Sequence, residues 1–184
     1  PLRIDMTSEI LDQEPNDRAE TAQAIDLPII INGRIDQPGD KDVFRFEAVG
    51  KVVAEVYARR AGSPLDSAVS VTDSTGAEIG FNDDFKDEAQ ALTTHHADSL
   101  LTATMSGKGP YCLHLSDAQR KGGHDFIYRL YVRAPRPDVD LRVVPSCIVA
   151  RPGAVVPITA HAVRREGFDD PIHLSLVEPP EGFK

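Results

Sequence analysis

Apolar and polar residues alternate with period two through most of residues 29–133, as in strands that bury one face. In DVFRFEA, for example, Phe44 and Phe46 fall on one face and Arg45 and Glu47 on the other. The alternation recurs in PIIINGRI, KVVAEVYARR, SAVSVTD, AEIGF, SLLTATM, GPYCLHL and DFIYRLYVR. Turn residues separate these runs. The pattern predicts about eight short strands and an all-β fold, an antiparallel jelly-roll-like β-sandwich.

The same alternation selects a core. It places the following side chains inside the sandwich: Phe44, Phe46, Val56, Val71, Leu113, Leu130 and Val132. In GPYCLHL this phase also turns Tyr111 inward, while Cys112 and His114 point outward. A buried Tyr111 hydroxyl should then have a hydrogen-bond partner.

Helical patterns are scarce. NDRAETAQAI, residues 16–25, is the best candidate, because Asp17 and Glu20 fit a capping box before an alanine-rich run. FKDEAQAL, residues 85–92, is a candidate for a single helical turn.

Prolines divide the chain. RAPRPDVD carries two of them and reads as a linker, so we expect a sandwich domain at residues 1–133, a linker at 134–140 and a second β domain at 141–184. An immunoglobulin-like sandwich requires about 100 residues. The second domain is therefore expected to be partial, and the chain to be a fragment of a longer protein.

Charge is concentrated near the start of the chain. Of the net charge of −9, residues 1–42 contribute −6, from ten acidic and four basic residues. No basic stripe could neutralise phosphates, which excludes nucleic acid as an expected partner. No apolar run is long enough to span a membrane. Two cysteines, Cys112 and Cys147, make no disulfide framework. Buried free thiols are expected, although pairing is open if the chain is exported.

Eight short motifs follow one another along the chain: EPND, INGRI, GDKDVFRF, SPLDS, GFNDD, HHADS, GPYCLHLSD and FIYRL. In this order they resemble the bacterial pre-peptidase C-terminal domain, in the version found in large secreted proteins of planctomycete-type bacteria. The match covers roughly residues 9–133. RREGFDDPIHLSL resembles the opening of an immunoglobulin-like domain. The resemblance implies a non-catalytic jelly-roll accessory module whose partner is the rest of its parent polypeptide. It also implies a secreted, cell-surface or periplasmic location.

The resemblance further implies a calcium site. Related collagen-binding domains of clostridial collagenases bind calcium through an acidic N-terminal segment. The matching residues here are Asp12, Glu14, Asn16, Asp17, Asp40 and Asp42, with Asp36 as an addition. Calcium takes six to eight oxygen ligands, which these side chains offer. Another interpretation stays open, in which Asn16 or Asp17 caps a short helix, and Asp40 and Asp42 belong to a solvated turn.

A second acidic group is less specific. Asp66 and Asp98 each precede a strand, and Asp83 and Asp84 follow another. These four side chains would hold a second cation if their loops met at one end of the sandwich. Ordinary surface turns are the favoured interpretation.

Two other functions are open. An adhesive module would bind polysaccharide or an extracellular protein on a sheet face, with Tyr57 and Tyr131 as candidate contacts on the outward phase of their strands. Packing of these tyrosines against a loop is the favoured alternative, because aromatic residues make up only 6% of the chain and none is Trp. A metal-dependent hydrolase would use His95, His96 and Asp98, although H-E-x-x-H is absent. The sequence favours the non-catalytic calcium-binding module.

Overall fold

A computed structural model describes residues 6–85, 97–107, 109–178 and 181–182. The chain divides into two compact units, Pro1–Pro135 and Arg136–Lys184. This division falls within the predicted linker, and the first strand of the second unit begins at Asp138. The described part of the chain contains no helix that is long and apolar enough to cross a membrane.

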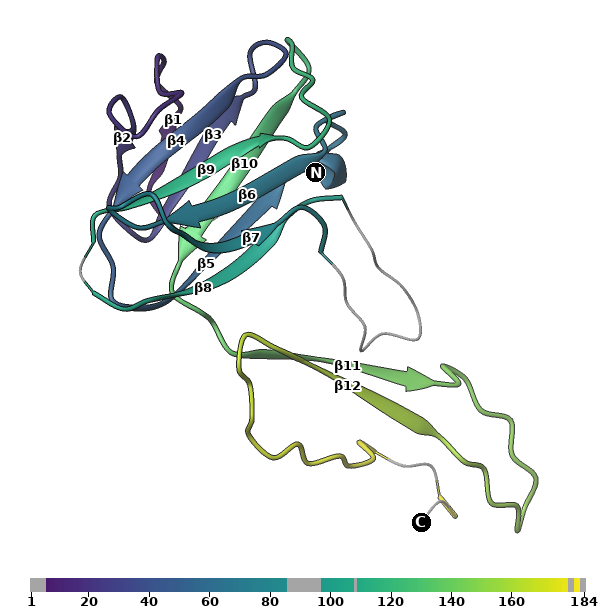
Figure 1. Ribbon diagram of the computed structural model, residues 1–184. Helices are drawn as coiled ribbons and strands as arrows, with labels where there is room; N and C mark the ends of the chain where they lie inside the picture. Colours follow the sequence, from purple (N-terminus) through teal and green to yellow (C-terminus); the bar gives the residue numbers. More distant parts are fainter. Residues whose placement is uncertain (1–5, 86–96, 108, 179–180, 183–184) are drawn as a thin grey trace. The chain divides into compact units, whose positions relative to one another are not determined.

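The first unit is a sandwich of two five-stranded sheets (Figure 1). Sheet A has the order β1-β3-β10-β5-β8, with strands Glu9–Leu11, Ile29–Arg34, Ile127–Arg133, Gly50–Tyr57 and Leu100–Met105. Sheet B has the order β2-β4-β9-β6-β7, with strands Gln23–Ala24, Lys41–Phe46, Tyr111–Asp117, Ser67–Thr72 and Glu78–Asn82. The eight predicted strands are all present, and every pairing between them is antiparallel. The all-β sandwich is confirmed.

The N-terminal segment adds one short strand to each sheet. β1 pairs in parallel with β3, and β2 pairs in parallel with β4, so both sheets are mixed at this edge. The helix predicted at residues 16–25 is wrong. The chain turns there instead, with the Thr21 amide donating to the Arg18 carbonyl at 3.0 Å, and then enters β2. Pairing with β4 overrides the weak propensity of such a short helix.

Only one helical element occurs among the described residues, the 3-10 turn η1, Arg59–Ala61. The turn expected at residues 85–92 lies, apart from Phe85, outside the described residues.

The predicted core is confirmed. All seven selected side chains are at most 2% exposed and belong to one cluster between the sheets. Tyr111 also lies in this cluster, and its hydroxyl accepts a hydrogen bond from the Gly107 amide at 2.9 Å and donates to the Gly107 carbonyl at 2.8 Å. Because Cys112 and His114 lie on the opposite face of β9, the strand register was predicted correctly.

The second unit contains a two-stranded antiparallel sheet, β11 (Asp138–Val144) and β12 (Thr159–Arg165). Asp140 and Arg165 form an ion pair across it, with 2.6 Å between Oδ2 and Nη2. Its immunoglobulin-like character stays a prediction. Both cysteines are free; Cys112 is buried, whereas Cys147 is exposed rather than buried as expected.

Candidate metal centre

Two segments of the chain meet at the edge of the sandwich that carries β1 and β2 (Figure 1). The first segment crosses from sheet A to sheet B between these strands. Its start is fixed by the Asp12 amide, which donates to the Asn32 carbonyl of β3 at 3.0 Å. Its middle is fixed by the Asn16 carbonyl, which accepts from the Val43 amide of β4 at 3.1 Å. These two bonds hold the first acidic arm across the sandwich edge.

The second arm is the turn that joins β3 to β4. Gly39 has φ of 86°, a left-handed conformation that favours glycine, and the turn closes with the Asp40 amide donating to the Gln37 carbonyl at 3.1 Å. The Asp40 carboxylate accepts hydrogen bonds from the Asp36 amide at 2.6 Å and from the Lys41 amide at 2.9 Å. These hydrogen bonds hold the Asp40 carboxylate within the turn. Asp42 lies two residues later, on the face of β4 that points toward the core.

The two arms bring five carboxylates together. One oxygen from each of Asp12, Glu14 and Asp42 lies within 4.8 Å of the other two. Glu14, Asp17 and Asp40 form a second such triangle, so Glu14 belongs to both. Of the seven residues predicted to bind calcium, the structure brings these five and Asn16 together.

Two buried oxygens in this cluster have no hydrogen-bond donor among the described residues, Oδ1 of Asn16 and Oδ1 of Asp42. Both residues are fully buried. The amide nitrogen of Asn16 donates to Oδ1 of Asp12 at 2.5 Å, which fixes the orientation of the Asn16 side chain. Buried acceptors without a donor are rare because each loses its hydration without compensation. A cation would compensate both.

Burial raises the pKa of Asp42 to about 8, and the nearby carboxylates of Asp12, Asp40 and Glu14 raise it further. Burial also raises the pKa of Asp12 to about 6, with the charge of Glu14 as the second cause. The pKa values of Glu14 and Asp40 are raised as well, again chiefly by burial. Such carboxyls are costly to ionise unless an opposite charge lies among them.

Tyr128 completes the site, and sequence reasoning missed it. This residue of β10 is buried, and its hydroxyl donates to Oδ2 of Asp42 at 2.5 Å. Gly33 makes room for it, since a Cβ there would lie 2.3 Å from the Tyr128 hydroxyl oxygen and 2.8 Å from the Cβ of Asp12. The alternation that turns Leu130 inward also turns Tyr128 inward, and a buried tyrosine needs a polar partner. That signal was present in the sequence.

Asp36 plays a different role from its neighbours. Its carboxylate is exposed and pairs with the guanidinium of Arg34, while its amide supports Asp40. It lies beside the cluster and is not one of the converging carboxylates.

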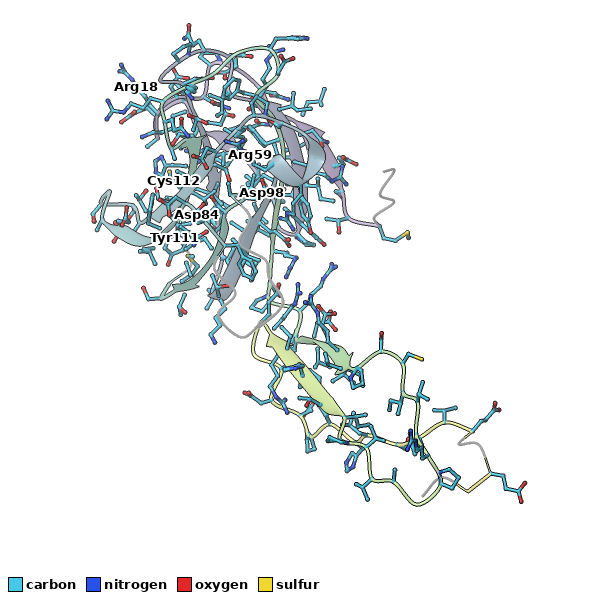
Figure 2. The ribbon with its side chains drawn as sticks, turned by 90° about the vertical axis from the view of Figure 1, so that its right-hand side faces the viewer. Arg18, Arg59, Asp84, Asp98, Tyr111 and Cys112 are labelled. Carbon is cyan, nitrogen blue, oxygen red and sulfur yellow. The ribbon has the colours of Figure 1, made fainter. Side chains whose placement is uncertain are left out.

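The four acidic residues of the second group do not converge on one potential cation site among the described residues. Asp98 is fully buried beside the 3-10 turn (Figure 2). Its Oδ1 accepts from the amides of Ala58 and Arg59 at 3.1 and 2.6 Å. Its Oδ2 accepts from the Arg60 amide at 3.1 Å and from Nε of Arg60 at 2.7 Å. Asp98 therefore anchors a turn, which its sequence context did not reveal.

The other three members of this group are less buried than Asp98. The carboxylate of Asp66 accepts from the Gln119 amide group at 3.0 Å, and Asp83 and Asp84 are exposed at the end of β7. None of the four belongs to a triangle of potential metal ligands among the described residues.

The residues of the two alternative functions are placed as follows. His95 and His96 lie outside the described residues. The guanidinium of Arg60 lies 3.9 Å from the ring centre of Tyr57. Tyr131 does face away from the core, but it is only 6% exposed, and its hydroxyl hydrogen-bonds to the Thr7 hydroxyl at 2.8 Å.

Comparisons with known proteins found similarity among solved structures. No family model matches the chain, and no curated protein matches it. Among solved structures, the pre-peptidase C-terminal domain of a collagenase from Bacillus anthracis is similar. It has 19% sequence identity and a TM-score of 0.43, and the match covers 64% of this chain and 100% of that chain.

Proposed function

We propose that the first unit is a non-catalytic, calcium-binding accessory module of an exported bacterial protein. In this proposal the module stabilises, spaces or anchors the longer polypeptide to which it belongs. The observation that carries the calcium part is a pair of buried oxygens, one on Asn16 and one on Asp42, that have no hydrogen-bond donor in the part of the chain that the structure describes. Both residues belong to the acidic cluster.

The chemistry of the donors favours calcium. Every potential ligand in the cluster is a carboxylate or amide oxygen, as hard cations require. Asn16 and Asp42 are buried and fixed, whereas Glu14 and Asp17 are exposed, so their side chains have room to adjust to a cation. An irregular set with adjustable members suits calcium, because magnesium demands a tighter octahedron and retains its waters.

The structural role follows from where the arms are attached. Asp12 is held by β3 of sheet A, and Asn16 is held by β4 of sheet B. A bound dication would offset the repulsion among the carboxylates. Asp12, Glu14 and Asn16 would then be tied to Asp40 and Asp42, and the N-terminal segment would be fixed across the sandwich edge.

The accessory role is supported by the sequence resemblance to the pre-peptidase C-terminal domain. Export is supported by the same resemblance. An extracellular polysaccharide or protein partner is also part of the proposal, and it is favoured by an exposed aromatic side chain, Phe81, beside a cavity on sheet B.

Calorimetric titration of the metal-free protein tests the calcium part. Calcium chloride should give a saturable heat, and magnesium chloride a much weaker one. Asp42→Asn should weaken binding strongly, because it removes a charge from the buried end of the cluster. Asp26→Asn removes an exposed charge outside the cluster and should bind calcium as the wild type does. Equal isotherms for Asp42→Asn and the wild type would reject the site.

A further inference from the structure

A second candidate site lies on the outward face of sheet B. A cavity of about 510 Å³ crosses the end of this sheet. Ser116 of β9 lies between Lys41 of β4 and Ala68 of β6, and Asp83 directly follows β7. The two central side chains are small, which leaves the floor open between a cation on one side and a carboxylate on the other.

The rim carries an aromatic ring and a strained arginine. Phe81 points outward from β7 and is 54% exposed. Arg120 also lines the cavity, and its φ is 57°, the left-handed region that non-glycine residues rarely occupy. Backbone strain of this kind is concentrated at functional positions, so the arginine side chain is a candidate for a role that glycine could not fill.

The charged groups around the cavity are available to a ligand. The side chains of Lys41, Asp83 and Arg120 are exposed and make no hydrogen bond or ion pair within the described part of the chain. Asp117 and Asp40, which also line the cavity, differ because their carboxylates already accept backbone hydrogen bonds. Asp117 accepts from the amides of Asp66, Gln119 and Lys121, and Asp40 of the acidic cluster accepts from the amides of Asp36 and Lys41.

We propose that this cavity binds a neutral polysaccharide, which names the class of partner within the proposed function. The apolar face of a sugar ring would stack on Phe81, as on other exposed aromatic faces. Its hydroxyls would accept hydrogen bonds from Arg120 and Lys41 and donate to Asp83. Polar groups of both signs suit an uncharged array of hydroxyls.

Two other ligand classes fit less well. An anionic polymer would meet the carboxylates around the cavity and a chain with a net charge of −9. An extended peptide that binds by strand addition needs a free sheet edge. The floor of this cavity is instead made of β9 and β6, each of which is paired on both sides, and only β7 at the rim is an edge strand.

Affinity electrophoresis in native gels tests the proposal. Separate gels contain hydroxyethyl cellulose, galactomannan, arabinoxylan, polygalacturonate or gelatin, and all contain calcium chloride. At least one of the three neutral polysaccharides should retard the wild type. Phe81→Ala and Arg120→Gly should each weaken that binding about tenfold. Lys51→Ala removes an exposed cation on sheet A and serves as the matched control, with unchanged retardation.

Arg120→Gly keeps the test independent of folding. Glycine accepts the left-handed conformation without strain, so the melting temperature of this variant should equal or exceed that of the wild type. Absence of retardation by every neutral polysaccharide, retardation only by polygalacturonate or gelatin, or unchanged binding by both variants would overturn the proposal. The assay reports sugar binding at constant calcium, so such a failure would leave the calcium site untouched.

Discussion

Tyr128 of sheet A donates its hydroxyl hydrogen to Asp42 of sheet B, and both side chains are buried. The bond joins the two sheets directly beneath the acidic cluster. It occupies one oxygen of Asp42 and leaves the other buried without a donor among the described residues. Tyr128 therefore orients the carboxylate that is the deepest proposed ligand.

Removing this hydroxyl should affect both stability and metal binding. In Tyr128→Phe the Oδ2 atom of Asp42 loses its donor and neither carboxylate oxygen has one, so the free energy of unfolding should fall by about 1–3 kcal/mol without calcium. Calcium affinity should also fall, because the carboxylate is no longer held in one orientation. Urea denaturation and calorimetric titration measure the two effects. Unchanged values in both experiments would show that the bond does not position Asp42.

The stability of the metal-free protein should decrease as the pH rises. The folded-state pKa values of Asp42 and Asp12 are raised to about 8 and about 6, so the folded protein binds protons more tightly than the unfolded chain. Their contribution is fully present below the ordinary carboxyl pKa of 3.8 and is lost as the pH rises through 6 and then 8. Urea denaturation in EDTA at pH 5, 6.5 and 8 should show this decline. Stability that rises across this range would contradict it.

Asp98 should contribute to the stability of the fold and not to calcium binding. Asp98→Ala leaves the amides of the 3-10 turn and the guanidinium of Arg60 without their acceptor, and should cost about 3 kcal/mol of stability. The loss should be equal in calcium and in EDTA. A loss confined to calcium-containing buffer would instead place Asp98 in a metal site.

Calcium should protect the N-terminal arm from proteolysis. Arg18 is exposed in the segment between β1 and β2, and trypsin can cleave after it only when the segment opens locally (Figure 2). Cleavage after Arg18 should be slower in calcium than in EDTA. Cleavage after Arg142 in the second unit provides the internal control. Equal rates at Arg18 under both conditions would show that the arm is not held by a cation.

Much of the sandwich could be predicted from the sequence because period-two alternation is a local signal. It located the strands from β3 to β10 and the inward phase of Tyr111. β1 and β2 were missed because strands of three and two residues are too short to alternate. The helix predicted at residues 16–25 was wrong because local propensity carries no information about the pairing of this segment with β4.

The acidic cluster was also partly predictable, because part of its signal is local in the sequence. The acidic residues that converge are near one another in sequence within each arm, so their clustering was visible. Tyr128 lies 86 residues from Asp42, and no local pattern indicates which strands face each other. Asp98 and Asp66 each precede a serine near the start of a strand and looked alike in sequence, yet Asp98 is a fully buried anchor and Asp66 is only half-buried, because burial depends on the packing of distant strands.

Thermal unfolding in millimolar calcium and in EDTA tests the central claim most directly. The comparison uses the wild type, a Glu14→Gln and Asp17→Asn double variant that removes two charges from the cluster, and a Glu20→Gln and Asp26→Asn double variant that removes two exposed charges elsewhere. Calcium should stabilise the wild type and the control variant by about 2.7 kcal/mol when its concentration is a hundredfold above Kd. It should stabilise the cluster variant far less. Identical melting curves of the wild type in calcium and in EDTA would contradict the account.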